Sequence, residues 1–251
     1  MARLDGHRIL VTGAARGLGR AIASALAESG AELVLADTLR AEGEAAAAAL
    51  SSAGAKAVFA PVDLGDPASI KALADEITMA GGKLDGLVNN GAIATGIGGK
   101  SLHEIDVDDW DRVMRVNVRG TWLMTKAAAP LLAASGRGRI VNIASDTALW
   151  GAPLLLAYVA SKGAVIAMTR SLARELGPEQ IGVTCVAPGI LKTMSTEYVP
   201  EERHRLYEAG RAVPGPQSPE DITGTIAFLL TPEALALTGQ VMPVNNGFVF
   251  T

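Results

Sequence analysis

The chain has 251 residues, of which 49% are hydrophobic and 19% charged, a balance typical of a globular protein with a substantial buried core. Its 22 Lys and Arg against 26 Asp and Glu give a net charge of −4, and the basic residues are scattered, which argues against a nucleic-acid partner. One cysteine excludes an intrachain disulfide, and three histidines far apart in the sequence favour no metal site.

The first residues, MARLDGHRILVTG, lack the long apolar stretch of a signal peptide. No apolar run elsewhere in the sequence is long enough to span a bilayer. We therefore expect a cytoplasmic protein that does not associate with a membrane.

Short β-rich segments alternate with helical patterns along the whole chain. The predicted strands are Arg8–Thr12, Leu33–Asp37, Lys56–Ala60, Leu84–Asn89, Arg139–Ala144, Gly182–Val186 and Gln240–Val244. The predicted helices include Arg20–Ser29, Leu39–Ser52 and two longer ones around Asp108–Ala134 and Ala157–Leu176. Several strands are continuous apolar runs, as sheets buried on both faces require. The pattern predicts a Rossmann-type α/β fold: a doubly wound parallel sheet of about seven strands with helices on both faces.

No linker-like stretch divides the chain, so residues 1–251 are predicted to form one dinucleotide-binding and catalytic domain. The segment 188–219 is rich in proline, glycine and charge. We expect this segment to be irregular and to pass over the site as a substrate loop.

The first predicted strand runs directly into a glycine-rich loop, in the sequence ILVTGAARGLGRAIA. Gly13, Gly17 and Gly19 let the backbone turn and approach a bulky anion, and the following helix offers free N–H groups at its N-terminus. Asp37 ends the next predicted strand, where a carboxylate accepts hydrogen bonds from a ribose diol. The alternative is an ordinary strand–helix turn with a solvated aspartate. The order of the elements favours a dinucleotide site.

Tyr158 and Lys162 lie four residues apart, so they share one face of a predicted helix. A free phenol, with a pKa of about 10, is a poor base at neutral pH, and a neighbouring ammonium favours its phenolate form. The pair predicts a reaction centre for proton transfer. The alternative is a surface Tyr–Lys pair on an amphipathic helix.

The chain resembles the short-chain dehydrogenase/reductase family over nearly its whole length. The segments that carry the resemblance, in chain order, are Thr12-Gly13 with Gly17-Leu18-Gly19, Val62-Asp63-Leu64, Leu87-Val88-Asn89-Asn90, Tyr158-x-x-x-Lys162, and Pro188-Gly189 with Thr193. Any one of these motifs is weak, but five in the right order are highly specific. The resemblance implies an oxidoreductase that transfers a hydride between a nicotinamide cofactor and an alcohol or carbonyl substrate.

The resemblance also implies four catalytic residues. Tyr158 is the general acid/base, and Lys162 lowers the pKa of Tyr158 and binds the ribose. Ser145, thirteen residues before Tyr158 at a strand end, polarises the substrate oxygen. Asn117, an amide on an apolar helical face, holds a proton-relay water; a purely structural hydrogen bond is the compatible alternative. The implied cofactor-binding residues are Gly13, Arg16, Gly17, Leu18, Gly19, Asp37, Asp63, Leu64, Asn90, Gly91, Tyr158, Lys162, Pro188, Leu191 and Thr193.

Two positions depart from the family pattern. The family usually has Asn-Asn-Ala-Gly after the fourth strand, where this chain has Asn89-Asn90-Gly91-Ala92. We expect the swap to keep room for the cofactor, and its effect on the local backbone stays open. Near the C-terminus, Asn245-Asn246-Gly247 replaces a common Asp-Gly-Gly.

Arg16 and Asp37 predict opposite cofactors. A guanidinium within the glycine loop suits the 2′-phosphate of NADP, whereas a carboxylate at the strand end repels it. We give the repulsion more weight and expect NAD. The alternatives are an NADP-dependent 3-oxoacyl-thioester reductase and a dinucleotide-binding regulator without catalysis.

The predicted substrate pocket is mostly apolar with a few hydroxyls, which favours a medium-sized or aromatic secondary alcohol or ketone. Its expected lining is Ala92–Gly96, Thr147, Trp150, Ile190, Met194 and Tyr198. Asp146 is expected to be solvated or to face a polar substrate. The small and apolar residues of the two long helices, with Phe248 and Phe250 in the tail, predict a homotetramer.

Overall fold

All seven strands join one parallel sheet, in the order β3-β2-β1-β4-β5-β6-β7. The computed structural model describes residues 3–251, apart from the side chain of Ser195. The strands are β1 (Arg8–Thr12), β2 (Glu32–Asp37), β3 (Ala57–Pro61), β4 (Gly86–Asn89), β5 (Arg139–Ile143), β6 (Gly182–Pro188) and β7 (Val241–Val244). Each predicted strand is confirmed to within two residues at either end. The predicted Rossmann-type sheet is therefore the observed one.

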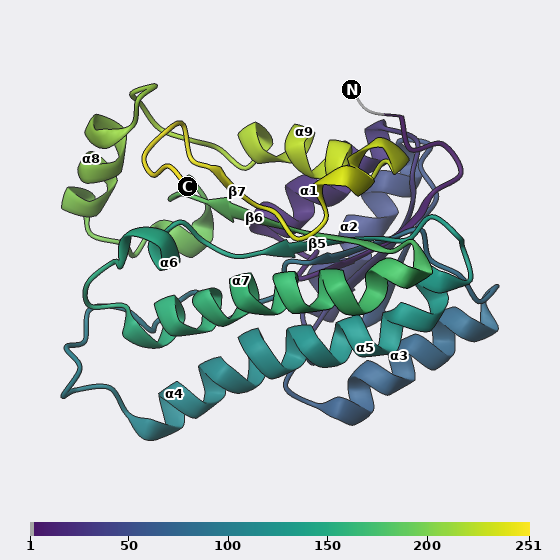
Figure 1. The fold of residues 1–251 in the computed structure, drawn as a ribbon, viewed down its shortest axis with the longest axis horizontal. Helices are drawn as coiled ribbons and strands as arrows, with labels where there is room; N and C mark the ends of the chain where they lie inside the picture. Colours follow the sequence, from purple (N-terminus) through teal and green to yellow (C-terminus); the bar gives the residue numbers. More distant parts are fainter. Residues whose placement is uncertain (1–2) are drawn as a thin grey trace.

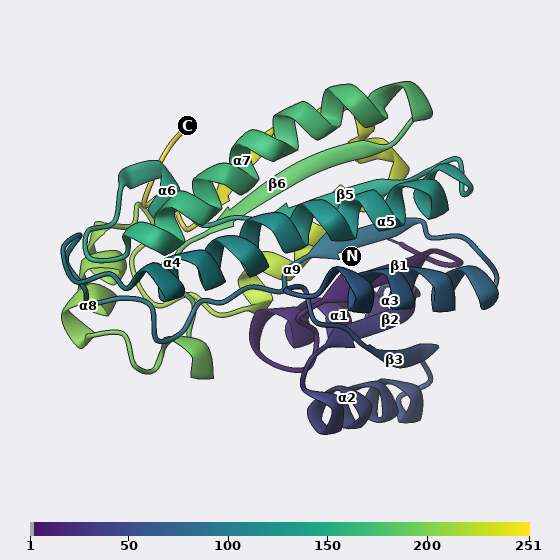
Figure 2. The ribbon, with the colours of Figure 1, turned by 90° about the horizontal axis from the view of Figure 1, so that it is seen from below.

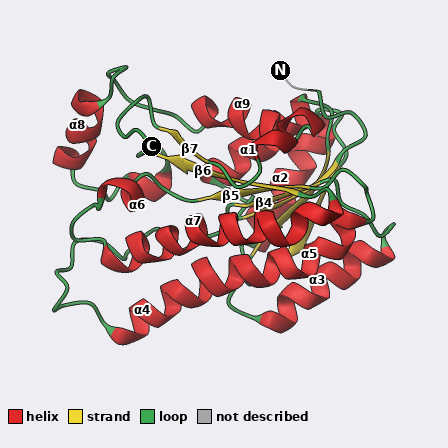
Figure 3. Ribbon diagram, in the orientation of Figure 1, coloured by secondary structure: helices red, strands yellow, loops and turns green. Residues whose placement is uncertain are grey.

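Helices cover both faces of this sheet, as Figures 1 and 3 show. The helices are α1 (Gly17–Glu28), α2 (Arg40–Ser52), α3 (Pro67–Met79), α4 (Val107–Val113), α5 (Thr121–Ala133), α6 (Thr147–Trp150), α7 (Leu156–Leu176), α8 (Glu201–Gly210) and α9 (Glu220–Leu229). Short 3₁₀ turns lie at Gly177–Glu179, Met194–Thr196 and Pro232–Leu237. Helices α1, α2 and α9 pack on one face, and α3, α5 and α7 pack on the other.

The sheet has apolar side chains on both faces because helices bury both. In β1, Ile9 and Val11 pack with α1 and α9, and Leu10, pointing the opposite way, packs with α3 and α5. All three side chains are fully buried. A strand with this environment reads as a continuous apolar run rather than an alternating one.

The segment predicted as one long helix around Asp108–Ala134 has a π-helical turn in its middle. Met114–Gly120 forms this turn between α4 and α5, so the three elements follow one another without a break (Figure 2). A π-helical turn contains an extra residue, and such turns occur frequently at functional sites. The apolar spacing of the sequence continues through the turn, which is why the pattern predicts a single helix.

The segment 188–219 is not irregular throughout, which corrects the prediction. It contains the 3₁₀ turn at Met194–Thr196 and the ten-residue helix α8. Helix α8 buries one side chain, that of Tyr207. Its sequence EERHRLYEAG is charged on most of its surface, so no apolar stripe indicates a helix. Residues of this segment line the cleft described below, at the place predicted for a substrate loop.

None of the helices within residues 3–251 combines the length and the hydropathy that a bilayer crossing requires.

Candidate active site

A cleft of about 1350 Å³ opens at the carboxyl ends of the strands. The chain order of the sheet reverses between β1 and β4, and in open parallel sheets ligands bind at this reversal. The cleft wall includes every predicted catalytic and cofactor-binding residue except Asn117. Residues far apart in the sequence, such as Gly13 and Thr193, thus meet around one cavity.

The glycine loop packs tightly against the end of β4. A Cβ atom on Gly19 would lie 2.0 Å from the carbonyl oxygen of Gly13, closer than any real contact. Asn90 ties the two loops together, because its Nδ2 donates to the carbonyl oxygens of Thr12 (3.0 Å) and Gly13 (3.1 Å). Gly13 and Gly17 both adopt the left-handed conformation, with φ of 65° and 57°. Glycine at these positions lets the first turn of α1 face the cleft.

The reversed pair Gly91-Ala92 has a packing explanation. A Cβ on Gly91 would lie 2.8 Å from Cδ1 of Leu64 and 3.2 Å from the backbone nitrogen of Gly13. Glycine at this position therefore allows the β4 loop to approach the glycine loop closely. Ala92 is exposed, where a methyl group meets no such restriction.

Asp37 is fixed beside the glycine loop, whereas Arg16 is not. The Oδ2 atom of Asp37 accepts a hydrogen bond from the backbone N–H of Ala15 (3.0 Å), and Oδ1 accepts one from that of Leu39 (3.1 Å). Arg16 precedes α1, and its side chain is exposed. A glycine cradle, a helix N-terminus and a fixed carboxylate together fit a dinucleotide, with the carboxylate on the ribose side.

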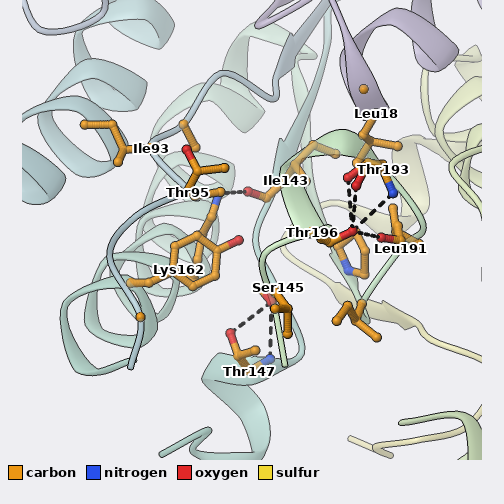
Figure 4. Close-up of a pocket in the computed structure, with 18 of the residues that line it drawn as sticks. Leu18, Ile93, Thr95, Ile143, Ser145, Thr147, Lys162, Leu191, Thr193 and Thr196 are labelled. Atoms are coloured by element: carbon orange, nitrogen blue, oxygen red, sulfur yellow. Dashed lines mark hydrogen bonds between the residues drawn. The ribbon is translucent and has the colours of Figure 1, made fainter. Parts of the chain in front are cut away.

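The remaining predicted cofactor residues line the same cleft. Asp63 bends the chain after β3 by accepting a hydrogen bond from the backbone N–H of Gly65 (2.7 Å), and Leu64 beside it is buried. Beyond β6, the backbone N–H of Thr193 donates to Oγ1 of Thr196 (3.1 Å). Figure 4 shows Leu18, Leu191 and Thr193 on the same side of the pocket.

Lys162 and Ser145 lie at the end of β5, beside Tyr158. The Nζ atom of Lys162 donates to the carbonyl oxygen of Ile143 (2.7 Å), the last residue of β5, and lies 5.6 Å from the centroid of the Tyr158 ring. Ser145 Oγ accepts a hydrogen bond from Thr147 Oγ1 (2.9 Å), as Figure 4 shows. The backbone N–H of Thr147 also donates to Ser145 Oγ (3.3 Å), so both lone pairs are used and the Ser145 O–H is free to donate toward the cleft. The sequence predicts Thr147 only as a pocket residue, so its bond to Ser145 is a new finding.

The pKa values in the site follow burial. Burial raises the pKa of Tyr158 to about 12, although a hydrogen bond with Ser145 acts in the opposite direction. Burial also lowers the pKa of Lys162 to about 8. Burial is the largest cause of the raised Tyr158 pKa, and Lys162 donates to Ile143, so a lowering of the Tyr158 pKa by Lys162 stays a prediction. Tyr158 is protonated at neutral pH.

Asn117 lies in the π-helical turn, and both polar atoms of its side chain make structural hydrogen bonds. Its Oδ1 accepts from the backbone N–H of Ile93 (2.7 Å), and its Nδ2 donates to the carbonyl oxygen of Ile93 (3.0 Å) and to Ser161 Oγ (3.1 Å). Its backbone carbonyl accepts from Thr121 Oγ1 (2.8 Å). Asn117 thus joins the β4 loop to α7, one residue before Lys162. A relay water at Asn117 stays a prediction.

Asp146 is neither solvated nor open to the cleft, contrary to expectation. Its carboxylate is completely buried and accepts hydrogen bonds from the Tyr207 hydroxyl (2.8 Å) and from Nδ2 of Asn245 (3.1 Å). Burial raises the pKa of Asp146 to about 6, against these two bonds. Asp146 directly follows Ser145, and its carboxylate therefore ties the end of β5 to α8 and to the C-terminal segment. This bond gives the unusual Asn245 a structural role.

Aromatic side chains surround this carboxylate. Tyr207 stacks on Phe248, with ring centroids 4.2 Å apart, and its hydroxyl accepts from Nε1 of Trp150 (3.0 Å). Trp150 packs here and does not line the cleft, contrary to the prediction. Phe248 is half-buried in the same cluster, so it is not an exposed residue of the tail. Phe250 is exposed, as expected.

Other expectations about the pocket lining are partly wrong. Ala92, Ile93, Ala94, Thr95, Thr147, Ile190 and Tyr198 line the cleft as predicted. Gly96 and Met194 do not, and Met194 faces solvent. Arg203, on α8, also lines the cleft. The sequence does not predict this position, because no pattern in it indicates that α8 exists.

Comparisons with known proteins identify the family. A family model described as enoyl-(acyl carrier protein) reductase matches residues 13–249. A 3-oxoacyl-(acyl-carrier-protein) reductase from Thermotoga maritima is 31% identical over 98% of this chain and 99% of its own. A Beutenbergia cavernae structure, described as an NAD(P)-dependent gluconate 5-dehydrogenase with NADP at low occupancy, superposes with a TM-score of 0.91, at 33% identity over 98% of both chains. A short-chain type dehydrogenase/reductase from Mycobacterium marinum superposes with a TM-score of 0.91 at 28% identity, over 99% of this chain and 98% of that one. The family model, these relatives and the shared fold establish that the chain belongs to the short-chain dehydrogenase/reductase family of oxidoreductases.

Proposed function

We propose that the protein is an NAD(H)-dependent oxidoreductase that interconverts a secondary alcohol and a ketone. The observation that carries the proposal is the cluster of Ser145, Tyr158 and Lys162 at the end of β5, in the wall of a cleft that also holds the dinucleotide cradle. A bound nicotinamide dinucleotide supplies the hydride acceptor or donor. The chain must then bind the substrate oxygen and move one proton.

In this proposal the substrate oxygen lies between the hydroxyls of Ser145 and Tyr158. Ser145, which accepts from Thr147, donates its own hydrogen to that oxygen and polarises the carbonyl. Tyr158, with a pKa of about 12, is protonated and acts as the acid when a ketone is reduced. Lys162, with a pKa of about 8, is the nearest group that can then return a proton to Tyr158. Alcohol oxidation reverses these steps.

We further propose NAD rather than NADP as the cofactor. Wild-type enzyme is expected to prefer NAD(H) by at least about tenfold in kcat/KM, because the fixed Asp37 carboxylate repels a 2′-phosphate and the exposed Arg16 side chain is free to turn away. Steady-state kinetics with both cofactors measure the preference. Asp37→Ala is expected to reduce it by improving kcat/KM with NADP(H).

Arg16→Ala is the matched control for this comparison, since it removes the opposing charge from the same loop. A wild type that prefers NADP, or an Asp37→Ala variant that gains nothing with NADP, contradicts the assignment. In that case the alternative of an NADP-dependent 3-oxoacyl-thioester reductase, favoured by the name of the Thermotoga maritima relative, takes its place.

A homotetramer also remains a proposal. Trp122 on α5 and Leu156 on α7 are large apolar residues with 46% and 47% of their surface exposed, and Phe250 is 80% exposed. We expect light scattering at micromolar concentration to give the mass of four chains of 25.8 kDa each. A mass of one chain rejects the proposal.

A further inference from the structure

The cleft wall contains four cationic side chains, of which one lies at the cofactor end and two are bonded to groups of this chain. Arg16 lies beside the glycine loop, and Lys162 donates to the end of β5. Arg205 pairs with Glu201 on its own helix, at 2.6 Å. Arg203 is the fourth, and within residues 3–251 no carboxylate lies within ion-pair distance of its guanidinium.

Arg203 is held in place by neutral groups. Its Nη2 donates to the carbonyl oxygen of Pro153 (3.2 Å), and its Cζ lies 5.5 Å from the centroid of the Trp150 ring. A guanidinium stacked on an aromatic ring and bonded to one carbonyl keeps most of its five N–H donors for another partner. The side chain is half-buried, so this partner replaces only part of its hydration.

The helix that carries Arg203 is itself fixed. Tyr207 lies one turn further along α8, and its hydroxyl both donates to the buried carboxylate of Asp146 and accepts from Trp150. Trp150 thus contacts both residues, with the Tyr207 ring packed edge-on against it at 6.2 Å. Arg203 is therefore pre-organised rather than a mobile surface residue.

The contacts of Arg203 also connect it to the reaction centre. Trp150 and Pro153 belong to the segment between Ser145 and Tyr158, the two groups proposed to hold the substrate oxygen. The cleft wall also contains Leu154, Leu155, Ile190 and Tyr198. A ligand that reaches from Ser145 to Arg203 thus meets apolar surface and then a cation.

We propose that Arg203 binds a carboxylate of the substrate, so that the enzyme acts on a keto acid or hydroxy acid. This inference rests on the proposed function, because it describes the far end of the same substrate. A carboxylate matches the planar fork of a guanidinium, and the resulting charge-assisted hydrogen bonds are stronger than neutral ones. Glu202, the preceding residue, also borders the cleft. Neighbouring residues of a helix differ in direction by about 100°, and the Glu202 side chain is exposed, so solvent screens its charge from a ligand at Arg203.

The test compares straight-chain keto acids of increasing length with their methyl esters, using the reduced cofactor. The ester keeps the ketone and removes the charge while adding one methyl group. Wild-type enzyme is expected to show kcat/KM for the best acid at least about tenfold above that for its ester, and Arg203→Ala is expected to bring this ratio close to one. Arg205→Ala is the matched control, since Arg205 is already paired with Glu201, and it should keep the wild-type ratio.

An acid-to-ester ratio near one in the wild type overturns the inference, as does a ratio that survives Arg203→Ala. Should other ketones be reduced but neither these acids nor their esters, the proposed function stands and the inference fails. Should no ketone of any kind be reduced, the proposed function fails, and the same acids and esters are then titrated as ligands by calorimetry. Tighter binding of acids that disappears in Arg203→Ala upholds the carboxylate site without the reaction. Equal binding of acids and esters rejects the site as well.

Discussion

Replacing Tyr158 by phenylalanine is expected to lower kcat by at least about 100-fold, the scale typical for removing general acid–base catalysis. The substitution deletes one oxygen and leaves the ring where it lies, 5.6 Å from Nζ of Lys162. Tyr158 is also an implied cofactor residue, but phenylalanine keeps its ring and the glycine loop and Asp37 are unchanged, so cofactor affinity should stay within about twofold of wild type, a fraction of 1 kcal/mol. Lost turnover with retained binding identifies the phenol as the proton-transfer group.

The measurement is kcat for alcohol oxidation and ketone reduction, followed through the absorbance of the reduced cofactor, with cofactor binding determined by fluorescence titration. Tyr198→Phe is the matched control. Its hydroxyl also lies in the cleft, where it donates to the carbonyl oxygen of Ala94. Losing this one hydrogen bond should cost at most about tenfold. Near wild-type rates in Tyr158→Phe, or equal losses in both variants, refute the mechanism.

Gly19→Ala is expected to reduce kcat/KM for the cofactor by about 100-fold, because a displacement of the binding loop by about 1 Å has effects of this size. The new Cβ would lie 2.0 Å from the Gly13 carbonyl oxygen and 2.5 Å from Nδ2 of Asn90. Both neighbours belong to the framework that positions the loop, so the loop itself must move. The melting temperature should fall as well, because the new methyl group would strain the hydrogen bonds of Asn90.

Gly224→Ala provides the control for Gly19→Ala. Gly224 lies in α9 and is exposed, and a methyl group added there would meet no atom within 4 Å. Alanine at this position should raise stability by about 0.5–1 kcal/mol through its better helix propensity and leave kinetics unchanged. Calorimetry and cofactor titration of both variants make the comparison. Normal cofactor affinity in Gly19→Ala shows that the loop is not the binding element.

The sheet is predictable because its signals are local. Each strand is an apolar run with turn residues on either side, and in the inner strands burial on both faces gives that run its character. Helix α8 is not predictable in this way. It buries only Tyr207, so its charged sequence lacks the apolar spacing by which a helix is recognised.

The residues of the site also separate into those with a local sequence signal and those whose role depends on the folded chain. The glycine loop and the Tyr158–Lys162 pair are short motifs, and the cleft contains them as expected. The partners of Asp146 lie 61 and 99 residues away in the sequence, so only the folded chain shows that its carboxylate is buried. The raised pKa of Tyr158 is hidden from the sequence for the same reason, since burial depends on elements that no local pattern reveals.

The π-helical turn at Met114–Gly120 has a consequence for how the chain can change length. The residues before it, in α4, pack toward α7, while those after it, in α5, pack toward α3 and β4. Each residue of a helix advances the direction of the side chains by about 100°, so deleting one residue from the turn would rotate one half against the other by that angle. If the half with Asn117 rotated, its amide would lose its hydrogen bonds to Ile93 and Ser161. If α5 rotated instead, its apolar stripe would turn away from the sheet. The extra residue therefore sets the angle between the half of this continuous helix that packs on α7 and the half that packs on α3 and β4.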